Sequence, residues 1–161
     1  MYRCENRRSL FRVNFPMQMC GSISICKIGQ KNVKSGKSNI CILDISAGGI
    51  QFKSKLSFPE SDVLYKVSFD LYDNFYEIEG VLKWKKQNRN NTFNYGMMFL
   101  QSEKEKEDLV QVIAKLMVHV KKDVSDIYSI CNSKCPNLEE LKLKYIYRKS
   151  ALADFFCIKF I

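Results

Sequence analysis

The sequence predicts a mainly β protein, a small antiparallel β-barrel of six strands followed by C-terminal helices. Three observations favour this fold class. Apolar and polar residues alternate with a period of two through most of residues 21–100, as they do in strands with one buried face. Turn residues separate these short segments, and closure into a barrel would remove their exposed edges. Beyond residue 101 the apolar residues follow helical spacing instead.

Three strands are expected in the first half of this region. Residues 21–28 and 39–45 are rich in β-branched side chains, which favour strands. The loop between them, residues 29–38, is rich in Lys, Gly and Ser, and we interpret its lysines as a solvated face. A pair of glycines then makes a tight turn into a third strand over residues 50–54.

The second half is expected to form a meander of antiparallel hairpins. Residues 63–71 alternate strictly, with large apolar side chains on one face. A returning strand over residues 78–84 has Trp84 on its apolar face, which predicts that this side chain belongs to the core. A polar tip follows, and residues 93–99 alternate again as the last strand.

The clearest helix signal covers residues 103–121. Ser102 is the expected N-cap, and the acidic residues after it suit the positive end of the helix dipole. Lysines near residue 121 suit the other end. His119 lies close to this end, where we expect it to act as a cation or as a packed ring.

The remaining residues form a C-terminal extension of unknown role. We divide the chain into a flexible basic arm (1–15), a barrel with its helix (16–122) and a helical extension (123–161). Residues 155–161 are very apolar, so we expect them to be buried against the domain, in a partner or at a surface. These three alternatives stay open, and a homodimer is one expectation from this apolar end.

Composition narrows the class of partner. The chain has 161 residues with a formal charge of +9, which favours anionic partners if the lysines are not simply a Lys-rich background. Seven scattered cysteines do not indicate a disulfide framework, and a single histidine argues against both a metal site and a catalytic triad. No apolar run of about 18 residues predicts a transmembrane helix. We also expect no signal peptide, so both observations predict a cytoplasmic protein. No Ser/His/Asp or Cys/His set and no P-loop or G-x-G-x-x-G motif is present, which predicts a protein without catalysis.

Two short motifs carry the functional information. The first is R-x-x-x-R, from Arg8 to Arg12, and the second is D-x-S-x-x-G, which contains Asp44, Ser46 and Gly49. Taken alone, the first is typical of a solvated basic terminus and the second of a capped β-turn. Together, in this order and with a meander downstream, they resemble the PilZ domain family over residues 6–116. The resemblance implies a barrel commonly followed by a helix, and a bacterial receptor for cyclic di-GMP.

The resemblance assigns the arginines to the phosphates and to a guanine of this ligand. An arginine fork binds phosphate oxygens or the O6/N7 edge of guanine in bidentate fashion, and its plane stacks on a base. In an extended segment Arg8 and Arg12 point to the same side, because they are four residues apart. Arg7 adds a further cation, which favours two stacked ligands per domain.

The resemblance also places the second motif against the ligand. Asp44 and Ser46 face the same way on a strand, because they are two residues apart. An ionised Asp44 accepts the two donors on the Watson–Crick edge of guanine, and Ser46 bonds guanine or phosphate. Gly49 lets the backbone approach closely or adopt a positive φ angle. The candidate ligand-binding residues are therefore Arg7, Arg8, Arg12, Asp44, Ser46 and Gly49.

The function expected from these residues is signal transduction without catalysis. Cyclic di-GMP would order the arm against the barrel and change the surface offered to an unknown downstream protein, in control of motility, adhesion or exopolysaccharide. No cofactor, metal or DNA partner is expected. One alternative is a basic barrel that binds single-stranded nucleic acid, which explains the charge equally well. The other is a PilZ-like adaptor without nucleotide binding.

Overall fold

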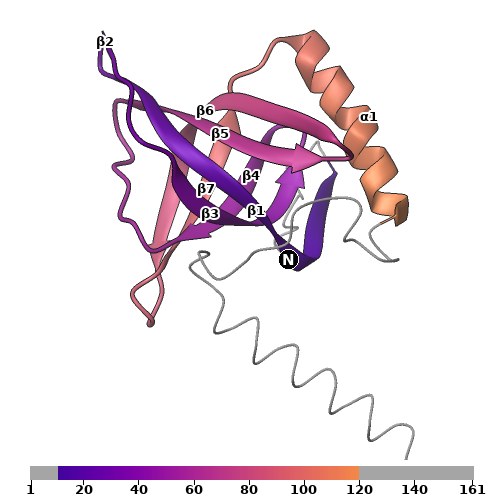
Figure 1. The fold of residues 1–161 in the computed structure, drawn as a ribbon, viewed down its shortest axis with the longest axis horizontal. Helices are drawn as coiled ribbons and strands as arrows, with labels where there is room; N and C mark the ends of the chain where they lie inside the picture. Colours follow the sequence, from indigo (N-terminus) through magenta and orange to yellow (C-terminus); the bar gives the residue numbers. More distant parts are fainter. Residues whose placement is uncertain (1–10, 120–161) are drawn as a thin grey trace, which may run out of the picture.

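A computed structural model of the protein describes residues 11–119, which form an antiparallel barrel with one helix (Figure 1). The elements are β1 (Arg12–Ile28), β2 (Lys31–Asn32), β3 (Ser38–Ser46), β4 (Gly49–Ser54), β5 (Val63–Leu71), β6 (Asn74–Gln87), β7 (Phe93–Phe99) and α1 (Glu103–His119). The sheet order is β2-β1-β3-β4-β7-β6-β5, and β1 also pairs with β5. This second pairing closes six strands into a barrel, with the short β2 attached to β1. The predicted fold class is therefore confirmed.

Strand β1 forms the seam of the barrel because it pairs on both sides. It pairs with β3 as far as Ile23, and with β5 from Gly21 onwards. A Cβ atom on Gly21 would lie 2.8 Å from the side chain of Ile42 and 3.1 Å from the carbonyl oxygen of Ser68. Glycine therefore fits the point at which β1 meets both neighbours.

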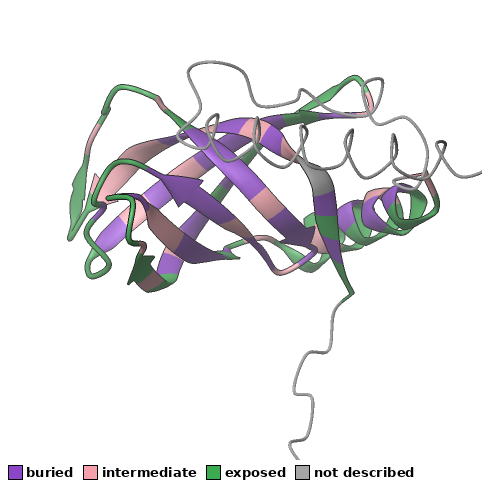
Figure 2. Cartoon of the chain, turned by 90° about the horizontal axis from the view of Figure 1, so that it is seen from below, coloured by how far each residue is buried: buried purple, intermediate pink, exposed green. Residues whose placement is uncertain are grey.

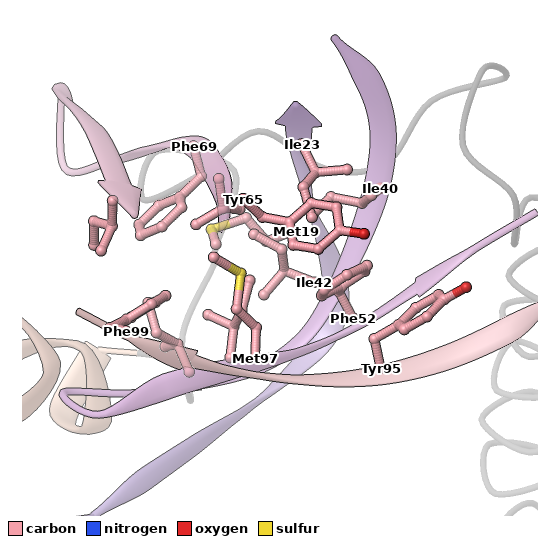
Figure 3. Packing of buried hydrophobic residues seen from close by; sticks show 14 of the residues in the cluster. Met19, Ile23, Ile40, Ile42, Phe52, Tyr65, Phe69, Tyr95, Met97 and Phe99 are labelled. Carbon is pink, nitrogen blue, oxygen red and sulfur yellow. The ribbon is translucent and has the colours of Figure 1, made fainter. Parts of the chain in front are cut away.

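The barrel interior is filled by apolar side chains from all six of its strands (Figure 3). Within this core, Phe52 and Tyr95 stack with ring centroids 5.0 Å apart. The Tyr95 hydroxyl donates to the carbonyl of Leu56 at 2.7 Å and accepts from the amide of Phe58 at 2.9 Å. Burial raises the pKa of Tyr95, so the phenol stays protonated and keeps donating. These bonds fix the connection between β4 and β5 to the core.

Helix α1 runs along one end of the barrel (Figure 1). It buries Leu109, Ile113 and Leu116 against the strands, and its other side is exposed, as Figure 2 shows. Its start has a capping box, in which the Ser102 amide donates to Glu105 at 2.8 Å and the Glu105 amide donates to Ser102 Oγ at 3.3 Å. The predicted N-cap is therefore confirmed. The predicted end near residue 121 lies outside the described residues.

Two boundaries differ from those expected or lie beyond the description. Strand β1 begins at Arg12, upstream of the expected barrel start at residue 16, so the second arginine of R-x-x-x-R is part of the sheet. Residues 1–10, which contain Arg7 and Arg8, lie outside the described residues. The expected extension over residues 123–161 lies outside them too.

Candidate ligand-binding site

A β-bulge at Leu43 determines where the second motif points. Ile42 pairs with the buried Phe52, whereas Asp44 pairs with Gln51, so β3 contains one residue more than β4 between these pairs. Strict alternation from Ile42 would place Asp44 inside the barrel. The extra residue reverses the alternation, so that Ile45 points inward and Asp44 points to the outer face.

Register across three strands then brings the motif residues together. On the outer face, Ser46 pairs with Arg12 of β1 on one side and with Gly49 of β4 on the other. Asp44 occupies the next outward row, between Asn14 and Gln51. Directly paired residues in a sheet point to the same side. Arg12, Asp44 and Ser46 therefore share one face of the barrel.

Arg12 and Asp44 form an ion pair at the centre of this face. Nη1 of Arg12 donates to Oδ1 of Asp44 at 2.8 Å. The Asp44 side chain is only 7% exposed, whereas the Arg12 side chain is 33% exposed. The carboxylate is thus held in a sheltered position with its charge compensated, and part of the Arg12 side chain remains accessible from solvent.

The end of the second motif is a tight hairpin. Ser46 pairs with Gly49 around a turn at Ala47 and Gly48, and Ser46 Oγ donates to the Gly49 carbonyl at 3.2 Å. Among the described glycines, a positive φ is found at Gly29 and not at Gly49. A Cβ atom on Gly49 would instead collide with the carbonyl oxygen of Met97. In the structure, glycine is needed here for the close approach of β7.

Trp84 is a candidate residue that the sequence analysis placed wrongly. A second bulge, at Lys83, makes Leu82 pair with Met97 and Trp84 pair with Gly96. Leu82 points inward, so Trp84 points outward, and it is 40% exposed rather than part of the core. Its indole lies over Gly96, because a Cβ atom there would collide with the indole nitrogen.

Trp84 belongs to the same outward row as Asp44. The row runs from Asp44 of β3 through Gln51 of β4 and Gly96 of β7 to Trp84 of β6. Three strand spacings separate the backbones at its ends, which is roughly 14 Å. The indole leans over Gly96 and so shortens this gap. No sequence signal indicated this exposed indole, because the pairing of Trp84 with Gly96 depends on the bulge at Lys83.

An apolar groove adjoins the charged face. It has a volume of about 180 Å³ and lies between the β3–β4 turn, the start of β1 and α1. Its lining residues are Phe11, Ala47, Val110, Ile113, Ala114 and Met117. Phe11 is 78% exposed and directly precedes Arg12. The turn at Ala47 therefore separates a polar surface from an apolar one.

His119 and Lys37, two polar residues outside the motifs, have contacts within the domain. The His119 ring accepts or donates a hydrogen bond at 3.0 Å with the Tyr72 hydroxyl, and the two rings meet edge to face. Lys37 pairs with Glu77 at 3.2 Å, while Lys31 and Lys34 are exposed. Within residues 11–119, no group of three or more His, Cys, Asp or Glu could hold a metal ion. The helix in this range is not long and apolar enough to cross a membrane.

Known proteins resemble this chain in sequence pattern and in fold. The family model of the PilZ domain matches residues 6–115. No curated protein matches the chain. The fold resembles the inhibitor of motility MotI/DgrA of Bacillus subtilis, with 16% identity, a TM-score of 0.52, and coverage of 70% of this chain and 52% of that one.

A second similar structure is a complex with a nucleotide. The MrkH–c-di-GMP complex of K. pneumonia is 14% identical, with a TM-score of 0.55 and coverage of 72% of this chain and 54% of MrkH. The match thus spans about half the length of each of these structures. At such identities the structural likeness shows the fold, and the match of the family model shows the family. This chain belongs to the PilZ domain family.

Proposed function

We propose that this protein is a receptor for cyclic di-GMP, which binds on the outer face of β1, β3 and β4. The observation that carries this proposal is the bulge at Leu43. It turns Asp44 and Ser46 outward beside Arg12, so that an acceptor, a hydroxyl and a cation share the outer face of the barrel. Family membership supports the choice of ligand, and MrkH, which has a similar fold, was solved with c-di-GMP.

The ion pair gives each group a role in binding. Each bidentate contact to a guanine edge contributes about 1–3 kcal/mol. In the proposed exchange of partners, Arg12 turns to a phosphate or a guanine edge, and guanine N1–H and its amino group donate to Asp44. Since Asp44 is buried, the guanine has to replace the donor that Arg12 withdraws.

Arg7 and Arg8 complete the proposed site from the segment just upstream of β1. Each cyclic di-GMP carries two phosphates, and two stacked ligands bring about four negative charges. Three arginines within Arg7–Arg12 suit this larger charge, so we propose two ligands per domain. No further cofactor is part of this proposal.

Trp84 supplies the proposed stacking surface at the other side of the face. Its exposed indole ends the outward row that begins at Asp44. Stacking of a base on an aromatic ring contributes about 1–3 kcal/mol, and it tolerates any base. In this arrangement Asp44 selects guanine, whereas Trp84 adds affinity.

The output of binding is a change in the surface near the start of β1. When ligand draws the residues before Arg12 onto the barrel and Arg12 changes its partner, the groove beside Phe11 and Ala47 changes as well. We propose that an unidentified downstream protein reads this change, in control of motility, adhesion or exopolysaccharide. The motility inhibitor MotI, which has a similar fold, agrees with the first of these.

Isothermal titration of cyclic di-GMP into the full chain tests the proposal. The wild type should bind at micromolar concentration or tighter, with a fitted stoichiometry of two. Arg12→Ala should weaken binding about 5- to 150-fold, because one contact of about 1–3 kcal/mol is lost. Arg89→Ala is the matched control, since it removes the same charge from the exposed β6–β7 turn.

Each outcome separates the alternatives. A stoichiometry of one would reject the two-ligand arrangement and leave the receptor intact. Absence of binding by the wild type would reject the receptor and favour an adaptor. Equal losses in Arg12→Ala and Arg89→Ala, with a steep salt dependence and binding of oligonucleotides, would favour a single-stranded nucleic-acid protein.

A further inference from the structure

Two cysteines lie directly opposite each other on the seam strand and its neighbour. Cys20 of β1 pairs with Cys41 of β3, between the pairs Met19–Ile42 and Gly21–Ile40. The register is continuous over these three pairs. Met19 and Ile42 point into the core, so both thiols lie on the opposite face of the sheet. Directly paired residues on one face are the closest side chains that a sheet offers.

The spacing of such a pair suits a disulfide. Antiparallel partners have Cα atoms about 4.5 or 5.5 Å apart, depending on whether the pair is hydrogen-bonded. Both distances fall within the range of about 4.4–6.8 Å over which disulfides form. The β1–β3 register is interrupted at residues 15–18, just before the pair.

The two thiols differ in burial, and this difference determines which of them a reagent from solvent meets first. Cys20 is half-buried, whereas Cys41 is fully buried. A reagent from solvent therefore reaches Cys20 first. Cys41 can be reached by a sulfur atom that is already in place on the neighbouring strand.

We propose that Cys20 and Cys41 form a site of reversible disulfide modification, oxidised by a low-molecular-weight disulfide. The Cys20 thiolate attacks one sulfur of the reagent, which forms a mixed disulfide and releases one thiolate. The Cys41 thiolate then attacks the Cys20 sulfur, which forms the cross-strand disulfide and releases the second thiolate. The two protein thiols lose two protons and two electrons, and the reagent is reduced to two thiols.

The site does not depend on the proposed ligand. Its effect is on the barrel itself, because the bond would join β1 to β3 at the point where β1 also begins to pair with β5. A crosslink that closes the chain between residues 20 and 41 restricts the unfolded state. Oxidation should therefore raise the midpoint of thermal unfolding.

Oxidised glutathione added to the native full chain tests the proposal. Peptide mapping without reductant should find the Cys20 and Cys41 peptides joined, and dithiothreitol should separate them. Cys41→Ser should stop the reaction at the Cys20–glutathione mixed disulfide, which identifies Cys41 as the resolving thiol. Cys26→Ser is the control, because Cys26 lies in a bulge of β1 and its thiol donates to the Leu64 carbonyl at 3.2 Å.

Three results would overturn the proposal. In the first, Cys20 keeps its glutathione in the wild type and Cys41 does not react. In the second, Cys20 is joined to a cysteine other than Cys41. In the third, neither cysteine reacts in the native protein although both react after denaturation. Circular dichroism of Cys41→Ser before the reaction tests whether its barrel is folded. If it is not folded, Cys41→Ala replaces it.

Discussion

Arg12 and Asp44 are diagonal neighbours on β1 and β3, and Nη1 of Arg12 donates to Oδ1 of Asp44 at 2.8 Å. The direct cross-strand partner of Arg12 is Ser46, and that of Asp44 is Asn14. The long arginine side chain therefore reaches across one step of the sheet to a carboxylate that is almost buried. The two motifs, far apart in sequence, meet through this bond.

Replacement of this carboxylate should weaken ligand binding. In Asp44→Asn the side chain keeps its shape, but its amide nitrogen is a donor and opposes the guanine donors. We expect an affinity for cyclic di-GMP about 5- to 150-fold lower, measured by isothermal titration. Asp70→Asn, at an exposed position of β5, should bind as the wild type does. Equal affinities of Asp44→Asn and the wild type would exclude a guanine contact at Asp44.

Deletion of Leu43 should preserve the two faces of β3. Ile42 and Asp44 then become adjacent, so regular alternation keeps Ile42 inward opposite Phe52 and Asp44 outward opposite Gln51. We expect the deletion variant to unfold cooperatively, followed by circular dichroism, as Leu43→Ala should. Loss of cooperative unfolding in the deletion variant alone would contradict the assignment of Leu43 as the extra residue of β3.

Fluorescence should report the position of Trp84, because the chain has a single tryptophan. Gly96→Ala introduces a Cβ atom where the indole now lies, so the ring must move and its emission spectrum should change without ligand. Cyclic di-GMP should quench the wild-type emission by stacking and quench this variant less. Gly36→Ala is the control, since open space surrounds Gly36. Unchanged emission on saturation with ligand would exclude stacking on Trp84.

The capping box of α1 should make helix stability depend on acid pH. Hydrogen bonds from the Ser102 side chain and backbone lower the pKa of Glu105 below its ordinary value of 4.5. Its folded pKa is thus below its unfolded pKa, so its stabilising effect is present above pH 4.5 and is lost as pH falls through the folded value. The difference in thermal midpoint between wild type and Glu105→Gln should shrink over that range. Glu107→Gln, at an exposed position of the same helix, is the matched control.

The cap hydroxyl can be tested separately. Ser102→Ala removes the acceptor of the Glu105 amide and should cost about 1 kcal/mol of stability. Urea denaturation measures this loss, and Ser102→Thr should restore most of it. A serine-to-alanine variant that unfolds at the wild-type midpoint would show that the hydroxyl contributes nothing measurable.

Sequence periodicity predicted those elements whose pattern is uninterrupted. Residues 63–71 alternate without a break, and β5 has those bounds. The helix start followed from chemistry rather than from periodicity, because Ser102 with Glu105 satisfies the exposed amides at a helix end. Asp44 and Ser46 were expected on one face, and their register places them there.

The errors arise where one extra residue enters a strand. The bulge at Lys83 reverses the alternation of β6, so Trp84 leaves the apolar face that Leu82 occupies. A bulge adds a residue without any change of composition, and nothing in the local sequence marks it. The same applies at Leu43, where the direction of Asp44 depends on pairing with β4. After a bulge, the pairing with the neighbouring strands determines which face of the sheet each side chain occupies.

The double pairing of β1 has a mechanical consequence. Residues Arg12–Asn14 pair with β3 alone, the register is interrupted at residues 15–18, and pairing with β5 begins only at Gly21. A force applied at Arg12 therefore acts first on the hydrogen bonds between β1 and β3. The β1–β5 hydrogen bonds that close the barrel bear it last. The first residues of β1 can therefore separate from β3 while the second half of the strand stays paired with both β3 and β5. One strand thus combines an end that can move with a segment that closes the barrel.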